Sequence, residues 1–181
     1  MPAKVPCATM RLLRKGLKTM IRDILNSIRQ NHALEHATLH LLARRSPGIR
    51  LVGRSGPSGF AIYGPASTGD VEAAAAEALA RLQRGDVHLA VHPNCGTNAV
   101  VTGVLVGGSA FAAGLGKAGS RWERLPLVLL VATLAAIVAQ PLAHLVQERV
   151  TTSPALQGAR VVGVRQEGQG HLVHRVQVQR G

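Results

Sequence analysis

Two long stretches without a charged side chain dominate the hydrophobic pattern of the chain. Residues 87–116 and 125–147 contain no Asp, Glu, Lys or Arg. Within these stretches, Ala99 to Gly116 and Leu125 to Val146 are apolar all around, whereas a helix on a soluble core would show a polar stripe. Both segments are long enough to cross the hydrocarbon core of a bilayer. The sequence therefore predicts two transmembrane helices.

The connection between the two predicted spans is short. It comprises the eight residues Lys117 to Arg124, so the spans should form an antiparallel hairpin whose flanking regions lie on one side of the membrane. Five Lys/Arg residues lie near the outer ends of the spans and three lie in the connection, which favours cytoplasmic termini. We therefore expect a multi-pass protein of a bacterial inner membrane.

Small residues mark one side of the first predicted span. Gly103 and Gly107 lie four residues apart, and small residues let helix backbones approach closely. Packing against the alanines of the second span is the simpler interpretation. A homodimer through Gly103 and Gly107 is the alternative.

The first 30 residues combine apolar positions at helical spacing with cations on the other faces. The apolar positions are Leu13, Leu17, Met20, Ile21, Ile24 and Ile28, and the cations are Arg11, Arg14, Lys15, Lys18 and Arg22. A basic amphipathic helix of this kind binds an anionic membrane surface, where each cation contributes about 1 kcal/mol. Residues 1–30 are therefore predicted to lie on the membrane surface, and packing of this helix on the folded domain is the alternative.

Shorter elements predict a small α/β domain in residues 31–98. Ile49 to Arg54 and Gly59 to Tyr63 are apolar segments on either side of a Ser-Gly-Pro-Ser turn, which indicates a β-hairpin. A helix should begin near Gly69, after a Ser or Thr cap. A strand is expected over Val87 to Val91.

A second β-hairpin is predicted in residues 147–181. Arg160 to Arg165 and His171 to Gln179 alternate around a glycine-rich turn. If both ends of the transmembrane hairpin face one compartment, this β-hairpin can join the first sheet. The expected fold is an α+β membrane protein with a ββαβ-type domain, a C-terminal β-hairpin, a transmembrane hairpin over residues 99–146 and an N-terminal surface helix.

Composition and charge exclude some classes of protein. The 181 residues include 21 Lys/Arg, 9 Asp/Glu, two cysteines and four aromatic residues, and the net charge is +12. Two cysteines cannot form the disulfide framework of a small secreted domain. The cations cluster in the N-terminal helix, there is no nucleic-acid recognition motif, and four aromatic residues offer little base stacking. The expected partners are the lipid bilayer and anionic lipids, and nucleic-acid binding is not expected.

The predicted helix that begins the α/β domain carries the first candidate chemistry. His32, Glu35 and His36 share one face of the helix, and the other face is apolar. Histidines four residues apart converge on one point. Two imidazoles with a nearby carboxylate can hold zinc and activate a bound water. We therefore expect His32 and His36 to bind zinc and Glu35 to act as a base.

A second group of candidate ligands, in the segment HPNCGTN, directly precedes the first span. His92 and Cys95 are both suitable zinc ligands, and a thiol near a helix N-terminus has a lowered pKa. Alternatively, the segment is a tight turn with a half-buried thiol, and Thr97 or Asn98 caps the incoming helix. A thiol hydrolase that uses Cys95 as its nucleophile is a further alternative.

The spelling His-x-x-Glu-His of residues 32–36 resembles the inverted-zincin metallopeptidases. The resemblance covers this one helix. It implies that His32 and His36 bind zinc, that Glu35 is the base, and that a distal glutamate is the third ligand. The usual distal position falls within the first predicted span, which has no Glu, so Glu77 is considered as a substitute.

The motifs HALEHATLH and HPNCGTN, in this order before a membrane hairpin, resemble an uncharacterised bacterial membrane-protein family, a domain of unknown function. That resemblance covers nearly the whole chain and supports the architecture, but it implies no activity. The function expected from the residues is a membrane-embedded, zinc-dependent hydrolase in which His32 and His36 share the metal with at least one of His92 and Cys95. The alternative is a non-enzymatic membrane protein whose His/Cys cluster is structural.

Overall fold

The computed structural model describes residues 7–115, 121–167 and 173–181. The helices in this part of the chain are α1 (Cys7–Arg45), α2 (Thr68–Gln83), α3 (Gly96–Gly114) and α4 (Arg121–Val146), with a short 3-10 helix η1 (Val87–Ala90) and a π-helical turn η2 (Gln147–Thr151). The strands are β1 (Val52–Gly56), β2 (Gly59–Tyr63), β3 (Ala159–Glu167) and β4 (Val173–Arg180). The predicted α+β class is confirmed.

The four strands form one antiparallel sheet in the order β1-β2-β4-β3. The C-terminal hairpin joins the first hairpin through the β2–β4 pair, where Ala61 lies opposite Arg175. In β4, buried His174, Val176 and Val178 alternate with more exposed neighbours, the period-2 pattern of a half-buried strand. The prediction that both hairpins share one sheet is therefore confirmed, although the turn of the second hairpin lies outside the described residues.

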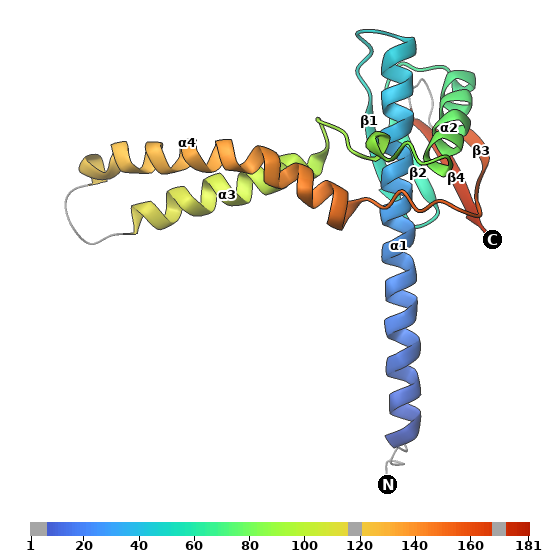
Figure 1. Cartoon of the computed structure of the whole chain (residues 1–181), viewed down its shortest axis with the longest axis horizontal. Helices are drawn as coiled ribbons and strands as arrows, with labels where there is room; N and C mark the ends of the chain where they lie inside the picture. The colour runs from blue at the N-terminus through green and yellow to red at the C-terminus, as the bar shows by residue number, and fades with distance from the viewer. Residues whose placement is uncertain (1–6, 116–120, 168–172) are drawn as a thin grey trace.

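The core of the domain lies between this sheet and two helices. α1 lies over β1 and β2, and α2 packs beside α1 and against β3 and β4 (Figure 1). Leu34 of α1, Leu82 of α2 and Phe60 of β2 are almost completely buried in one apolar cluster. Burial of a side chain of this size contributes about 1.5–3 kcal/mol. The cluster therefore fixes the middle of α1 against the sheet.

Several predicted boundaries need adjustment. The predicted surface helix and the HALEH helix form the single helix α1. The predicted N-terminus of α2 is confirmed, since the Ser67 hydroxyl caps it by accepting a hydrogen bond from the Asp70 amide. The strand expected over Val87 to Val91 is wrong, because that segment is η1 and an extended turn. The carbonyls of Ala90 and Val91 accept hydrogen bonds from histidines of α1 instead of pairing with a strand.

Helices α3 and α4 lie side by side as an antiparallel hairpin that projects sideways from the middle of α1 (Figure 1). Gly96–Gly114 and Trp122–Thr151 are long and apolar enough to cross a membrane, and their most apolar windows are 0% and 6% buried. Large side chains such as Phe111 and Ile137 are more than 60% exposed. The hairpin is thus not the core of a globular domain, which supports a membrane protein.

Gly103 and Gly107 do not pack against α4. Both are exposed, and a Cβ atom at either position would meet no atom within 4 Å. The interpretation that these glycines serve packing within the hairpin is therefore wrong. Association of two chains through them stays a prediction.

Candidate metal centre

Three candidate ligands meet where the middle of α1 faces the loop before α3. His32 and His36 lie one turn apart on α1, and Cys95 is the residue before the first turn of α3. One side-chain donor atom from each residue lies within 4.8 Å of the others. The distance from His32 Nε2 to Cys95 Sγ is 3.3 Å, and a tetrahedral zinc ion holds such ligand atoms about 3.5 Å apart. The three donors therefore lie close enough together that they could hold one metal ion.

Backbone carbonyls fix the tautomers of both histidines. His32 Nδ1 donates to the carbonyl of Thr151 at 3.0 Å, and His36 Nδ1 donates to the carbonyl of Ala90 at 2.7 Å. A carbonyl only accepts, so each Nδ1 atom carries a proton and each Nε2 atom is left to face the cluster. Partners of this kind orient the histidine ligands of metals in proteins and raise their basicity.

Cys95 has the charge state of a metal ligand. Burial raises the pKa of its thiol, but hydrogen bonds with His32, His36 and Thr97 outweigh that effect and lower the pKa to about 5. The thiolate, which is the form that binds metals, is therefore favoured. Although burial lowers the pKa of His32, its hydrogen bonds with Cys95 and Thr151 raise it overall, so that in the metal-free site His32 donates from Nε2 to the Cys95 thiolate. A bound metal would displace this Nε2 proton.

The Cys95 sulfur also caps α3 by accepting a hydrogen bond from the Thr97 amide at 3.4 Å. The predicted caps, Thr97 and Asn98, are wrong because both residues lie inside the first turn.

Glu35 is buried beside the three ligands. Its carboxylate accepts a short hydrogen bond from the Ser55 hydroxyl of β1, and burial raises the pKa of the carboxyl. The neighbouring residue on the same face of β1 is Gly53, where a Cβ atom would overlap Glu35 Oε1. The site therefore depends on a glycine and a serine of β1 that the sequence analysis did not identify. Their i, i+2 spacing places them on one face of the strand, but nothing in the sequence shows that this face meets Glu35.

His92 lies beside the ligand cluster. The centroid of its ring is 5.7 Å from that of His36 and 4.7 Å from that of His40. Its Nδ1 atom accepts a hydrogen bond from the Asn94 amide at 3.2 Å, so a neutral ring carries its proton on Nε2 and has no lone pair left for a metal. Burial, followed by the charges of His40 and His36, lowers the pKa of His92 to about 4. As placed, His92 is a hydrogen-bond donor.

A buried glutamine joins the site to the hairpin. Gln147, the first residue of η2, is fully buried. Its side-chain oxygen accepts from the His92 amide at 3.1 Å, and its side-chain nitrogen donates a short hydrogen bond to Asn98. π-helical turns are frequent at functional sites. Both ends of the α3–α4 hairpin therefore meet at the candidate metal centre.

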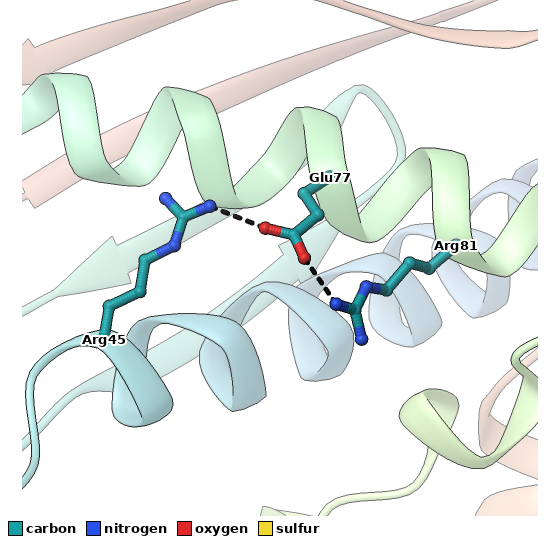
Figure 2. A network of polar contacts seen from close by, with 3 residues as sticks. All are labelled: Arg45, Glu77 and Arg81. Atoms are coloured by element: carbon teal, nitrogen blue, oxygen red, sulfur yellow. Dashed lines mark hydrogen bonds and ion pairs between the residues drawn. The ribbon is translucent and has the colours of Figure 1, made fainter.

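The suggestion that Glu77 replaces a distal zinc ligand is wrong. Its carboxylate lies between two guanidinium groups, Arg45 Nη2 at 2.6 Å and Arg81 Nη2 at 2.7 Å (Figure 2). The hydrogen bond from Arg45 is the main reason that the pKa of Glu77 is lowered. Arg45 is the last residue of α1, so Glu77 joins the far end of this helix to α2.

A cavity of about 540 Å³ opens beside the three ligands. Its polar lining includes Glu35 and His92, and its apolar lining includes Leu39, Leu51 and Val52. Concave sites that combine apolar side chains with convergent polar groups are typical of small-molecule binding, and the polar groups are numerous here because the candidate ligands themselves line the cavity. The cavity leaves room for water and an organic group next to the donor atoms.

Comparison with known proteins gives a family and no activity. No solved structure matches the chain. An uncharacterized protein of Picosynechococcus sp. is 35% identical over an alignment of 149 residues, and the match covers 74% of this chain and 69% of that protein. The family described as Domain of unknown function (DUF6391) matches residues 27–164, a range that includes the three ligands and the α3–α4 hairpin. The expectation of an uncharacterised family is thus confirmed, and the chain belongs to the DUF6391 family.

Proposed function

We propose that this chain is an integral membrane protein in which His32, His36 and Cys95 hold one zinc ion, and that the zinc site is a hydrolase centre. The observation that carries the proposal is the meeting of three donor atoms within 4.8 Å, with both histidines oriented by carbonyls. Imidazole and thiolate are ligands that zinc prefers.

The number of ligands favours catalysis over a purely structural role. Catalytic zinc sites use three protein ligands and leave a fourth position for water or substrate, whereas structural sites use four. The cavity beside the cluster gives such a water access to a substrate. Zinc in this position would lower the pKa of the bound water.

Glu35 is the proposed general base. Its carboxyl group lines the same cavity, is held by Ser55 and has a raised pKa, which brings it closer to the range useful for proton transfer at neutral pH. With zinc bound, Glu35 would take a proton from the water as its oxygen bonds to the substrate, and would pass that proton to the group released when the scissile bond breaks. His92, with its proton on Nε2, donates a hydrogen bond to the oxygen on which negative charge develops.

The second candidate function is a structural metal site with His92 as the fourth ligand. The observation in its favour is the position of the His92 ring, 5.7 Å from that of His36. For this closed site, His92 would have to release the Asn94 amide so that a ring nitrogen with a lone pair faces the metal. The three-ligand site requires no such change.

Metal content measured on the full chain purified in detergent tests both candidates. Wild type is expected to hold about one zinc ion per chain, and His32→Ala, His36→Ala and Cys95→Ser are expected to lose it. His88→Ala is the matched control, because His88 is exposed and outside the cluster. If wild type binds no zinc after loading and dialysis, the proposal is wrong.

His92→Ala distinguishes the two functions, whereas Glu35→Gln should keep the metal in both. In the three-ligand site, His92→Ala keeps the metal. In the closed site, His92→Ala releases the metal and lowers the melting temperature, because metal binding there contributes directly to folding.

A further inference from the structure

The N-terminal half of α1 extends beyond the folded domain (Figure 1). Every residue from 14 to 26 is exposed. The exposed large apolar side chains of this segment are Leu17, Met20, Ile21, Ile24 and Leu25, each between 40% and 54% exposed. An apolar surface of this kind on a packed protein marks an interaction site. We call these five side chains the apolar stripe.

The apolar stripe faces the same side of α1 as the metal centre. Ile24 lies four residues before Ile28, which is about one turn of an α-helix. Ile21 lies seven residues before Ile28 and Glu35 seven residues after it, and each spacing is about two turns. The loop into α3 contacts α1 on this same side, where Cys95 meets His32. The stripe therefore borders the side from which the α3–α4 hairpin leaves the domain, where His32 contacts the returning segment, and it also borders β1, which Glu35 contacts.

The orientation of α1 relative to the α3–α4 hairpin determines how the apolar stripe lies relative to the membrane. The hairpin projects sideways from α1, so that the long axis of α1 runs across it (Figure 1). A hairpin inserted along its own length leaves α1 lying along the membrane plane. Because the stripe borders the hairpin side and its side chains are exposed, these side chains can enter the lipid surface.

The charges of the segment match anionic lipid. Residues 14–26 carry four cations and one acid, a net charge of 4 − 1 = +3. The cations are Arg14, Lys15, Lys18 and Arg22, and the acid is Asp23. Cations beside an apolar helix face bind anionic headgroups while the apolar side chains enter the boundary of the acyl chains.

We infer that the N-terminal half of α1 docks on the anionic surface of the same bilayer that α3 and α4 cross, with the apolar stripe in the headgroup layer. Ile28 continues the stripe into the lining of the cavity. The docked helix thus holds the mouth of that cavity beside the lipid headgroups. The inference rests on insertion of the hairpin and does not depend on the metal.

Tryptophan fluorescence of the full chain in vesicles tests this docking. Trp122→Phe removes the natural tryptophan, and a single tryptophan is then placed at Ile21 in the stripe or at Thr19 on the opposite side of the helix. The vesicles contain brominated phosphatidylcholine, with or without phosphatidylglycerol. In anionic vesicles, the Ile21→Trp variant is expected to show blue-shifted emission and to lose intensity through bromine quenching. The Thr19→Trp variant should show a much smaller blue shift and much less quenching.

Charge dependence is the second readout. Removal of phosphatidylglycerol, high salt or substitution of the four cations by glutamine should each reduce the quenching of the Ile21→Trp variant. Equal quenching at the two positions would overturn the docking. A blue shift without bromine quenching would also overturn it, because a second copy of the chain would then cover the stripe. Equal quenching of Ile21→Trp in neutral and anionic vesicles would refute the preference for anionic lipid.

Discussion

The Nδ1 atom of His32 donates a hydrogen bond to the carbonyl oxygen of Thr151, 119 residues later in the chain and 3.0 Å away. Thr151 is the last residue of η2, the turn that follows α4. One proposed zinc ligand is therefore oriented by the segment through which the chain returns from the hairpin. This bond links the geometry of the site to the position of the hairpin.

Arg29 supports that link, and its loss should weaken zinc binding. Its Nη2 atom donates to the carbonyls of Arg149 and Thr152, on either side of Thr151. Arg29→Ala frees this segment without removing a ligand, so zinc affinity is expected to fall about 10- to 100-fold. Competition with a chelator measures the change. Arg44→Ala, at an exposed position of the same helix, should have no effect, and unchanged affinity in Arg29→Ala would contradict the link.

Gly53 should tolerate no side chain. A Cβ atom there would overlap the carboxylate of Glu35, so Gly53→Ala must displace Glu35 or β1, at a cost of about 1–3 kcal/mol in the free energy of unfolding. Denaturant unfolding measures the loss. Gly56→Ala in the same strand is the control, since its Cβ would meet its nearest atom at 3.9 Å. Equal stability of the two variants would show that Glu35 is not confined by β1.

The part of the site that sequence alone predicted follows from local geometry. His32 and His36 were identified because residues four apart on a helix point the same way whatever the tertiary fold. The choice between His92 and Cys95 depended on the conformation of one loop. In the structure, Cys95 caps α3 and meets His32, whereas His92 is turned so that its Nδ1 atom bonds to the Asn94 amide.

Contacts between distant segments account for what the sequence did not predict. Gly53 and Gln147 matter only because β1 and η2 lie against α1 and the loop before α3, and no local periodicity encodes those contacts. The strand expected over residues 87–91 failed for a related reason. Its alternating apolar residues fit a strand, but the imidazoles of His36 and His40 compete for the carbonyls. By contrast, the hairpins and the long apolar helices were predicted because their patterns are local.

The bridge between Arg45 and Glu77 should stabilise the fold in a pH-dependent way (Figure 2). The pKa of Glu77 is lowered in the folded state, chiefly by Arg45. Its stabilisation is therefore present above the ordinary carboxyl pKa, about 4.5, and is lost as the pH falls through the lowered value. Glu77→Gln should lower the melting temperature at pH 7, as thermal unfolding measures, and the difference from wild type should shrink in acid.

Glu72→Gln is the matched control for this bridge, because Glu72 is exposed on the same helix. It should leave the melting temperature nearly unchanged at both pH values. A Glu77→Gln difference that persisted in acid would mean that the carboxylate charge is not its cause.

The last prediction concerns the position of the hairpin in the membrane. The antiparallel packing of α3 and α4 brings both flanking segments to the metal centre, through Cys95 and Thr151, so these segments must share a compartment. Reporters fused in the α3–α4 connection and after Gly181 should therefore give opposite compartment signals, with the C-terminus cytoplasmic because more cations flank the outer ends of the spans than lie in the connection. Opposite signals with the C-terminus outside would keep the hairpin and reverse its orientation. Identical signals would mean that the hairpin does not cross the membrane, and the exposed apolar surface of α3 and α4 would then need a protein partner to cover it.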